Sequence, residues 1–484
     1  SPVVVDGVMD TSGNWGWVYA VDAATGKRLW VFNPQVDGKW GRRSCCDVVN
    51  RGVAVWKGHV FVASLDGRLF ALDAATGNTL WERQTLIDED RFQVITAAPH
   101  IAGDKVIVGN SGSELGVRGY ISAYDIETGE LAWRFFTVPG DPKLPFEHPE
   151  LVAASKTWDP NSLWDIGGGG TAWDAMAYDP ILNILFVGTG NGSPHPVYSR
   201  SPEGGDNLYL ASILAINPDS GRLIWHYQTT SGDSWDYTAT QNMILADLDV
   251  LGERRQVIMQ APKNGFFYVL DRLTGELLSA DAYGKVTWAS HVDLESGRPV
   301  LNDVADFSKA PKLIYPGQAG AHMWEPMSYS LETGLVYIPV MQLPQVYSYA
   351  PAAAYRPGGD NQHVKILGYD DPAVADQIAR EGMPEVKTFI QAWDPVAKQE
   401  RWRVKIADHD HIGGIMSSAG SLIFQGDHAG NFNIFSARDG ALLKTIHVGT
   451  GMMAAPISYS VDGVQYVSIM AGLGGSGHWR YTDD

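Results

Sequence analysis

Two adjacent cysteines are the first residues in the chain whose type and spacing could support chemistry. Cys45 and Cys46 are the only cysteines among 484 residues. Adjacent cysteines can form a disulfide only inside a strained eight-membered ring, so oxidation requires a scaffold that holds this geometry. Two reduced, buried thiols that act as small apolar side chains are the alternative. The pair alone leaves both interpretations open.

Two other patterns could indicate a binding site. His409 and His411 alternate and could share one face of a strand, which makes a metal site conceivable and a polar rim the alternative. The glycine clusters GGGG at 167–170 and GTGNG at 188–192 resemble nucleotide loops only in composition. Neither cluster lies in a strand–turn–helix context, so we do not predict a nucleotide site.

A repeated segment organises the whole chain. AVDAATGKRLW at 20–30 recurs as ALDAATGNTLW at 71–81 and AYDIETGELAW at 123–133. Weaker copies occupy 215–225, 269–279, 392–402 and 434–444. Alternating apolar residues before each copy predict a strand, and the Asp-x-x-Thr-Gly core predicts a tight turn. The Leu and Trp that follow begin another strand, and the Trp can pack between neighbouring units.

A unit of a few antiparallel strands cannot bury its own face, and radial stacking of such units forms a β-propeller. The longer intervals between copies predict inserted loops around 134–180 and 280–390, where functional residues tend to lie. One short helix is expected at 371–382, with Asp371 as its cap and Pro372 in its first turn. No apolar run approaches the length of a membrane span.

The net charge of the chain limits the classes of molecule that it can bind. The chain has 36 Lys and Arg against 55 Asp and Glu, a net charge of −19. Such a surface repels phosphates, which argues against nucleic acid or an anionic membrane and favours a basic soluble partner.

Several motifs, in this order along the chain, resemble those of the pyrroloquinoline quinone (PQQ) alcohol dehydrogenases. They are CCDVVNRG, GSELGVRGY, GGGGTAW, GTGNGSP, GDSWDYTATQ and PKNGFFYVLDR, together with the AxDxxTGxxxW repeat. The resemblance implies an all-β, eight-bladed propeller with Trp-docking repeats, formed as a single domain by residues 1–484. Compared with the family pattern an N-terminal stretch is missing, so the last blade is expected to be incomplete.

The resemblance also implies a cofactor site. The Cys45–Cys46 disulfide would cover one face of PQQ, and Trp173 would stack on the other. Further residues match positions that hold the PQQ carboxylates and polar edge: Arg51, Thr96, Gly112, Ser113 and Thr171. Arg51 suits this role because its guanidinium pairs bidentately with carboxylates. A disulfide in this place implies an oxidising compartment, and we expect a periplasmic protein.

Glu114, Asn191 and Asp236 match the metal ligands of the family. Taken singly, Asn191 could be a turn residue and Asp236 a cap at a strand end. Calcium prefers such oxygen ligands. Lanthanide-using relatives have a second Asp two residues after the catalytic one, where this chain has Thr238, so we expect Ca²⁺.

The implied reaction is the oxidation of an alcohol. Ca²⁺ would act as a Lewis acid on the quinone C5 carbonyl, Asp236 would take the hydroxyl proton, and a hydride would pass to C5. Lys263 would stabilise the negative charge that develops on the quinone oxygen, although it could also be a surface lysine in a hairpin turn. The chain has no Cys-x-x-Cys-His motif for a covalent haem. Electrons would therefore pass to a soluble acceptor such as a c-type cytochrome, or to an artificial dye.

Two departures from the family pattern bear on the substrate. Met323 replaces an Asn that usually contacts PQQ, and His411 and Ile412 replace a Trp–Asn pair beside the substrate. Loss of the Trp predicts a wider entrance, so we expect polyols and sugars as substrates besides simple alcohols. A non-catalytic propeller scaffold and a carbohydrate-binding propeller are the alternatives. Neither accounts for the residues at 114, 173, 191 and 236.

Overall fold

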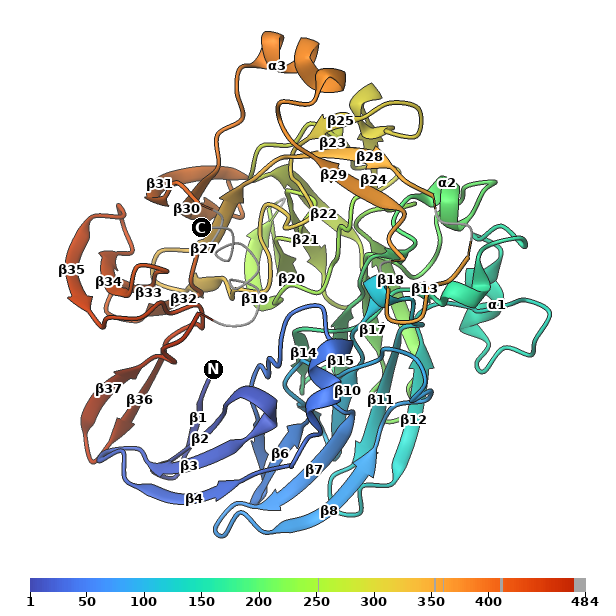
Figure 1. Ribbon diagram of the computed structural model, residues 1–484. Helices are drawn as coiled ribbons and strands as arrows, with labels where there is room; N and C mark the ends of the chain where they lie inside the picture. Colours follow the sequence, from blue (N-terminus) through green and yellow to red (C-terminus); the bar gives the residue numbers. More distant parts are fainter. Residues whose placement is uncertain (251, 352–353, 360, 410–411, 474–484) are drawn as a thin grey trace.

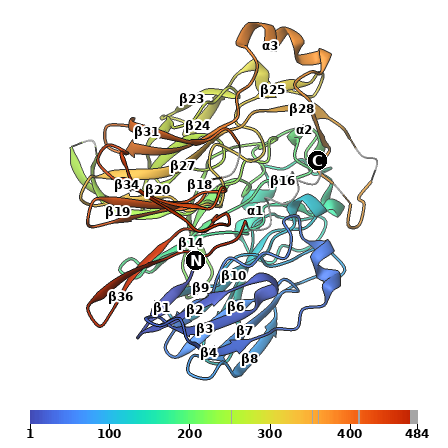
Figure 2. The same ribbon diagram turned by 60° about the vertical axis from the view of Figure 1, so that its left-hand side comes forward.

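Seven four-stranded antiparallel sheets, arranged in a ring, form the body of the molecule (Figures 1 and 2). The computed structural model describes residues 1–250, 252–351, 354–359, 361–409 and 412–473, and the sheets are counted within them. A two-stranded sheet, β36 (Ile457–Val461) and β37 (Val464–Ser468), lies beside the first four-stranded sheet. The predicted all-β propeller is therefore confirmed.

The strands follow the chain order with few exceptions. The first three sheets contain β1 (Val3–Val5), β2 (Val8–Ser12), β3 (Val18–Asp22), β4 (Arg28–Phe32); β5 (Ala54–Trp56), β6 (His59–Ala63), β7 (Arg68–Asp73), β8 (Thr79–Gln84); β9 (His100–Ala102), β10 (Lys105–Gly109), β11 (Tyr120–Asp125), β12 (Leu131–Phe136). The next two contain β14 (Met176–Asp179), β15 (Ile184–Gly188), β17 (Ser212–Ile216), β18 (Leu223–Gln228); β19 (Ile244–Val250), β20 (Glu253–Gln260), β21 (Phe266–Asp271), β22 (Leu277–Ala282). The last two contain β26 (Ser328–Ser330), β27 (Leu335–Gln342), β30 (Lys387–Asp394), β31 (Gln399–Ala407); β32 (Ile415–Ser418), β33 (Leu422–Gly426), β34 (Asn431–Ser436), β35 (Leu442–His447).

Smaller elements lie in the connections between these strands. The short strands are β13 (Gly168–Gly169), β16 (Gly192–Ser193), β23 (Ala289–Asp293), β24 (Arg298–Leu301), β25 (Lys312–Ile314), β28 (Gln345–Tyr349) and β29 (Val364–Leu367). The helices are α1 (Glu150–Ser155), α2 (Val197–Arg200) and α3 (Ala375–Glu381). The Asp371 side chain accepts a hydrogen bond from the backbone N–H of Ala373 at the turn that leads into α3, which confirms the predicted short helix. None of the described helices has the length and apolarity that a membrane crossing would need.

Each copy of the sequence repeat forms the turn between the third and fourth strands of a sheet. In the first copy the Asp22 carboxylate accepts hydrogen bonds from the backbone N–H and the hydroxyl of Thr25, at 2.8 and 2.7 Å. Asp73 and Thr76 make the same two bonds in the second copy. The predicted turn is confirmed, and these bonds between Asp and Thr are local.

In the copies that contain it, the repeated Trp links one sheet to the next. Trp30 Nε1 donates to the carbonyl oxygen of Ala74 at 2.9 Å, across the boundary between the first two sheets. The Trp30 ring lies over Gly77, where an added Cβ would stand 2.5 Å from the ring. Trp81 covers Gly129 in the same way. Gly77 and Gly129 therefore provide the space into which the Trp of the preceding copy docks.

The direction of the strands decides where the loops gather. Neighbouring strands in each sheet run antiparallel. The repeat turns, between third and fourth strands, therefore lie at one end of the ring. The connections between second and third strands, and those from one sheet to the next, lie at the other end. Residues from distant parts of the sequence can converge there on one site.

Candidate active site

A cavity of about 210 Å³ lies among these converging loops. Its wall is formed by Cys45, Cys46, Val49, Arg51, Thr96, Ser111, Gly112, Glu114, Thr171, Trp173, Asn191, Asp236, Thr238, Lys263, Met323 and Trp324. The predicted site residues are all in this wall except Ser113. The buried Ser113 hydroxyl lies 2.9 Å from that of Thr171, so it supports the wall rather than lining it.

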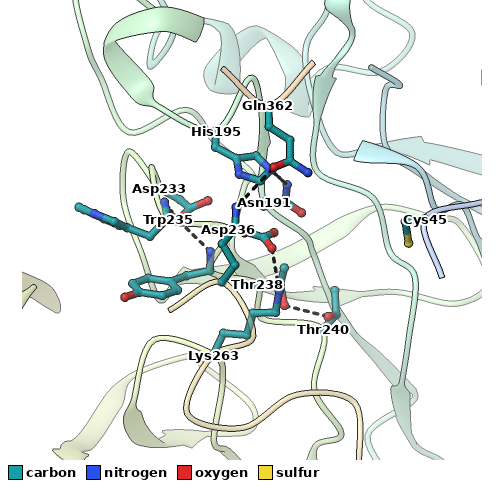
Figure 3. A network of polar contacts seen from close by, with 12 residues as sticks. Cys45, Asn191, His195, Asp233, Trp235, Asp236, Thr238, Thr240, Lys263 and Gln362 are labelled. Carbon is teal, nitrogen blue, oxygen red and sulfur yellow. Dashed lines mark hydrogen bonds and ion pairs between the residues drawn. The ribbon is translucent and has the colours of Figure 1, made fainter. Parts of the chain in front are cut away.

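Asp236 and Lys263 form an ion pair inside the cavity (Figure 3). Lys263 Nζ donates to Asp236 Oδ2 at 3.0 Å, and the lysine side chain is only 4% exposed. Burial raises the pKa of Asp236, and the charge of Lys263 opposes that rise. The carboxylate is thus a stronger base than a solvated Asp, while the ammonium beside it favours its ionised form. Lys263 is therefore not a surface residue.

The backbone at Asp236 is held in an unusual conformation. Its φ is +67°, in the left-handed region that non-glycine residues seldom adopt. The neighbouring Asp233 carboxylate accepts hydrogen bonds from the backbone N–H groups of Trp235 and Tyr237, at 3.1 and 3.0 Å. These bonds hold the turn that directs the Asp236 side chain into the cavity. Burial raises the pKa of Asp233 to about 7, and Arg200 opposes this effect.

Asp236 also belongs to a cluster of possible metal ligands. One donor atom each of Glu114, His195 and Asp236 lie within 4.8 Å of one another. Asn191 is fully buried beside them, and its Oδ1 has no hydrogen-bond partner among the described residues. Burial and the charge of Asp236 raise the pKa of Glu114. The predicted trio Glu114, Asn191 and Asp236 is therefore brought together, with His195 as an unpredicted fourth member.

Arg200 is a further residue of the site that no sequence pattern singles out. Its buried guanidinium donates to the carbonyl oxygens of His195 and Asp233, at 2.6 and 2.9 Å. Gly192 makes room for it, since a Cβ at that position would lie 2.1 Å from Arg200 Nη1. Arg200 thus joins the loop that carries Asn191 and His195 to the turn that carries Asp236. An arginine at the end of the short helix α2, without a local motif, offers no signal of such a role.

Arg51 presents its guanidinium to the cavity between two aromatic rings. The guanidinium carbon lies 5.1 Å from the centre of the Trp173 ring and 5.7 Å from that of Trp324. Asp174 lies beside it, with Oδ1 3.5 Å from Arg51 Nε. Burial raises the pKa of Asp174 to about 7, and Arg51 opposes this effect. Within the described residues Arg51 Nε and Nη1 have no hydrogen-bond partner, so they can bind an anionic group.

Cys45 and Cys46 are joined by a disulfide, as the resemblance implied. They line the same cavity as Trp173. Polar groups complete the wall: Thr96 Oγ1 lies 2.9 Å from Ser111 Oγ, and the backbone N–H of Arg51 donates to the Thr96 carbonyl oxygen. A planar ligand could therefore contact an apolar face and a hydroxyl-lined edge at once.

The departures from the family pattern have different places in the structure. Met323 lines the cavity, as its sequence position suggested. Ile412 does not line it: the side chain is fully buried and packs in an apolar cluster with Met341 and Ile390. The expected position of Ile412 beside the substrate is therefore not observed. His409 is among the described residues but His411 is not, so the suggested pair of His409 and His411 lies partly outside them.

Comparison with known proteins agrees with the resemblance seen in the sequence motifs. The family described as "PQQ: Glucose/ethanol/alcohol dehydrogenase, beta-propeller domain" matches residues 1–280 and 302–467. Quinohemoprotein alcohol dehydrogenase ADH IIB of Pseudomonas putida is 52% identical over 475 residues. That match covers 98% of this chain and 67% of the relative, so the chain spans about two thirds of its length.

Two further matches concern activity and structure. The 1-butanol dehydrogenase (cytochrome c) of Thauera butanivorans is 43% identical, over 98% of this chain and 68% of the relative. The crystal structure of quinohemoprotein alcohol dehydrogenase from Comamonas testosteroni superimposes with a TM-score of 0.93 at 46% identity. It is matched over 98% of this chain and 70% of that one.

Proposed function

Because the chain belongs to the family of PQQ-dependent alcohol dehydrogenases, we propose that its cavity holds PQQ and a divalent cation and oxidises alcohols there. The observation that carries the proposal is the convergence of the buried Asp236–Lys263 pair, the Glu114–Asn191 cluster and Arg51 on one cavity. A non-catalytic scaffold or a carbohydrate-binding propeller would have no need of a buried base beside a cluster of metal-type ligands.

The chemistry of the wall fits PQQ, a planar tricarboxylate. Arg51 Nε and Nη1 have no hydrogen-bond partner among the described residues and can pair with a carboxylate. The Cys45–Cys46 disulfide and Trp173 supply apolar surface for the flat faces. The polar edge would be bound by Arg51, Thr96, Gly112, Ser113 and Thr171, and the quinone oxygen by Lys263.

The cluster around Asp236 fits a divalent cation. Glu114 and Asp236 supply carboxylates, and Asn191 has an orphaned buried Oδ1. Lys263 offsets one of the two negative charges, which leaves a net charge of about −1 around the ion. Thr238, in the same wall, adds none. The site therefore suits Ca²⁺ better than a trivalent ion.

Asp236 acts as the general base in the proposed mechanism. Its carboxylate removes the hydroxyl proton of the alcohol, and burial makes it a stronger base than a solvated Asp. When bound, PQQ supplies an electrophilic carbonyl carbon that accepts the hydride, and the cation beside it increases that electrophilicity. Lys263 favours the ionised form of Asp236 and donates a hydrogen bond where negative charge develops. The burial of both side chains limits access of water to this pair.

Substrate and acceptor are proposed from the relatives and from this chain's own residues. The 1-butanol dehydrogenase match supports primary alcohols as substrates and a c-type cytochrome as electron acceptor. The substitution of Trp by His411 extends the proposal to polyols and sugars, with methanol as a poor substrate. The disulfide and the family membership favour a periplasmic location.

The proposed architecture is one eight-bladed propeller domain. The β36–β37 pair, with two strands in the described residues, would be the eighth blade between β35 and β1. The Tyr459 hydroxyl in this pair donates to the carbonyl oxygen of Ala23 in the first sheet, at 2.9 Å. This contact joins β36 to the first sheet, which is the next sheet in the ring.

Reconstitution tests the function. The purified chain is mixed with PQQ and Ca²⁺, and reduction of an artificial dye is followed with 1-butanol, glycerol, glucose and methanol as substrates. We expect the PQQ absorption spectrum to change on binding and dye reduction to require PQQ, Ca²⁺ and alcohol together. PQQ binding without turnover on any alcohol would contradict the dehydrogenase assignment. Methanol as the preferred substrate would contradict the wider entrance.

A further inference from the structure

His195 lies within the proposed cation site, although its sequence context gave no indication of a role there. The side chain is fully buried. One of its ring nitrogens lies within 4.8 Å of the nearest carboxylate oxygens of both Glu114 and Asp236. Ligand atoms that each stand 2.3–2.6 Å from one calcium ion can be no more than about 5 Å apart. The spacing of the three donor atoms is therefore compatible with one shared ion.

The position of the imidazole is fixed by its neighbours. The backbone N–H of His195 donates to the carbonyl oxygen of Gln362 at 2.9 Å, and its own carbonyl oxygen accepts from Arg200. Asn191 Nδ2 donates a hydrogen bond to His195 Nε2 at 3.1 Å, so the ring and the amide stand side by side (Figure 3). A cation bound at Nε2 would replace this hydrogen bond. A ring held in this way is pre-organised for coordination, because little side-chain freedom remains to be lost.

We propose that His195 is a fourth protein ligand of the cation, and that its nitrogen donor lets the site bind Mn²⁺ as well as Ca²⁺. A neutral imidazole adds a donor without changing the charge of the site, so the preference for a divalent ion is retained. Nitrogen donors favour first-row transition metals, whereas carboxylates suit both Ca²⁺ and Mn²⁺. A site of two carboxylates, one amide and one imidazole therefore fits Mn²⁺. The proposal deepens the proposed function, since it concerns the same cation site.

The test uses the 484-residue chain, with and without PQQ, and Mn²⁺ as the probe. Electron-spin-echo modulation of bound Mn²⁺ reports a directly coordinated imidazole nitrogen, and calorimetry gives the affinities for Mn²⁺ and Ca²⁺. We expect nitrogen coupling in the parent chain. His195→Gln keeps an amide oxygen near the ion, so Ca²⁺ binding should persist. Its Mn²⁺ affinity should fall about tenfold or more, and the nitrogen coupling should disappear. The matched control is His100→Gln in β9, away from the cavity, and it should behave as the parent.

Three results would overturn the proposal: no Mn²⁺ binding under either condition, Mn²⁺ binding to the parent without nitrogen coupling, or coupling that survives in His195→Gln. An equal loss of Ca²⁺ and Mn²⁺ affinity in His195→Gln would also contradict it, because His195 would then only support Asn191. The parent measurement needs no variant, so poor folding of His195→Gln would leave the test intact. Nitrogen-coupled Mn²⁺ in a chain that oxidises no alcohol would contradict the proposed function alone.

Discussion

At the scale of single residues, the buried contact between Asp236 and Lys263 is central to the proposed chemistry. An amide at position 236 keeps the size of the side chain but cannot accept a proton. Asp236→Asn should therefore reduce kcat by about 10³-fold, within the range that a general base contributes. PQQ binding, followed by absorbance, should be retained. A variant with bound PQQ and turnover within tenfold of the parent would rule out Asp236 as the base.

The Cys45–Cys46 disulfide should matter more for activity than for stability. A disulfide stabilises a fold mainly by closing a loop, and adjacent residues close almost none. Replacement of both cysteines by Ala should lower kcat by about tenfold, because the cavity loses part of its apolar wall. The melting temperature of the PQQ-free chain should change little. A decrease of roughly 8 °C or more, equivalent to several kcal/mol in a chain of this size, would show a structural role instead.

Asp10 provides a residue-scale prediction that is independent of the cavity. It is buried in β2, and burial raises its pKa to about 6, above the ordinary 3.8. The folded chain therefore favours the neutral carboxyl, and ionisation lowers stability as the pH rises from about 3.8 to about 6. Asp10→Asn should raise the free energy of unfolding by about 1 kcal/mol at pH 8 and hardly at all at pH 4. The control is Asp6→Asn at an exposed turn position, which should show no such difference between the two pH values.

The residues that could be predicted from the sequence are those in motifs with a fixed local context. Asp236, Lys263 and Arg51 lie where the resemblance placed them, and each faces the cavity. His195 and Arg200 could not be predicted in the same way. Their roles depend on contacts between loops that antiparallel strands bring together, and no spacing along the chain encodes such contacts. Ile412 is the opposite case. It occupies a motif position, but its side chain packs in the apolar core and does not line the cavity.

At the scale of elements, the docking of Trp30 over Gly77 can be separated from backbone strain. Both Gly77 and Gly26 have positive φ in equivalent turns, but a Cβ at Gly26 would meet nothing within 4 Å. Gly26→Ala should lower the free energy of unfolding by about 1–2 kcal/mol from strain alone. Gly77→Ala should lower it by about 2–4 kcal/mol, because its Cβ also collides with the indole. Equal costs, measured by urea unfolding of both variants, would show that the docking contributes nothing.

The repeated element was the part of the fold that the sequence predicted best. Its turn depends on hydrogen bonds between residues three apart, such as Asp22 and Thr25, and such bonds have a local signature. The small strands β13 and β16 were not predicted. They consist of two residues each, and they form only because Gly169 lets the backbones of the two loops meet: a Cβ there would lie 2.4 Å from the carbonyl oxygen of Asn191.

At the scale of the whole molecule, the net charge of −19 should govern the encounter with a redox partner. Opposite charges accelerate association at low ionic strength, and salt screens the effect. Electron transfer to a basic c-type cytochrome should therefore slow several-fold between about 10 and 200 mM salt. Reduction of a neutral quinone dye should not change, which serves as the control. A cytochrome rate that is independent of salt would argue against electrostatic docking.

The contact that closes the ring joins residues much farther apart in the sequence than the contacts between successive sheets. Trp30 reaches a carbonyl 44 residues ahead, whereas the bond from Tyr459 to Ala23 spans 436 residues. The entropy lost on closing a loop grows with the logarithm of its length, so the second contact costs about 2 kcal/mol more chain entropy than the first. Each sheet can thus assemble on its predecessor through short-range contacts, and the seam between β36–β37 and β1–β4 joins last. For the same reason the seam is where the folded ring should open first, and amide hydrogens there should exchange before those of the inner strands.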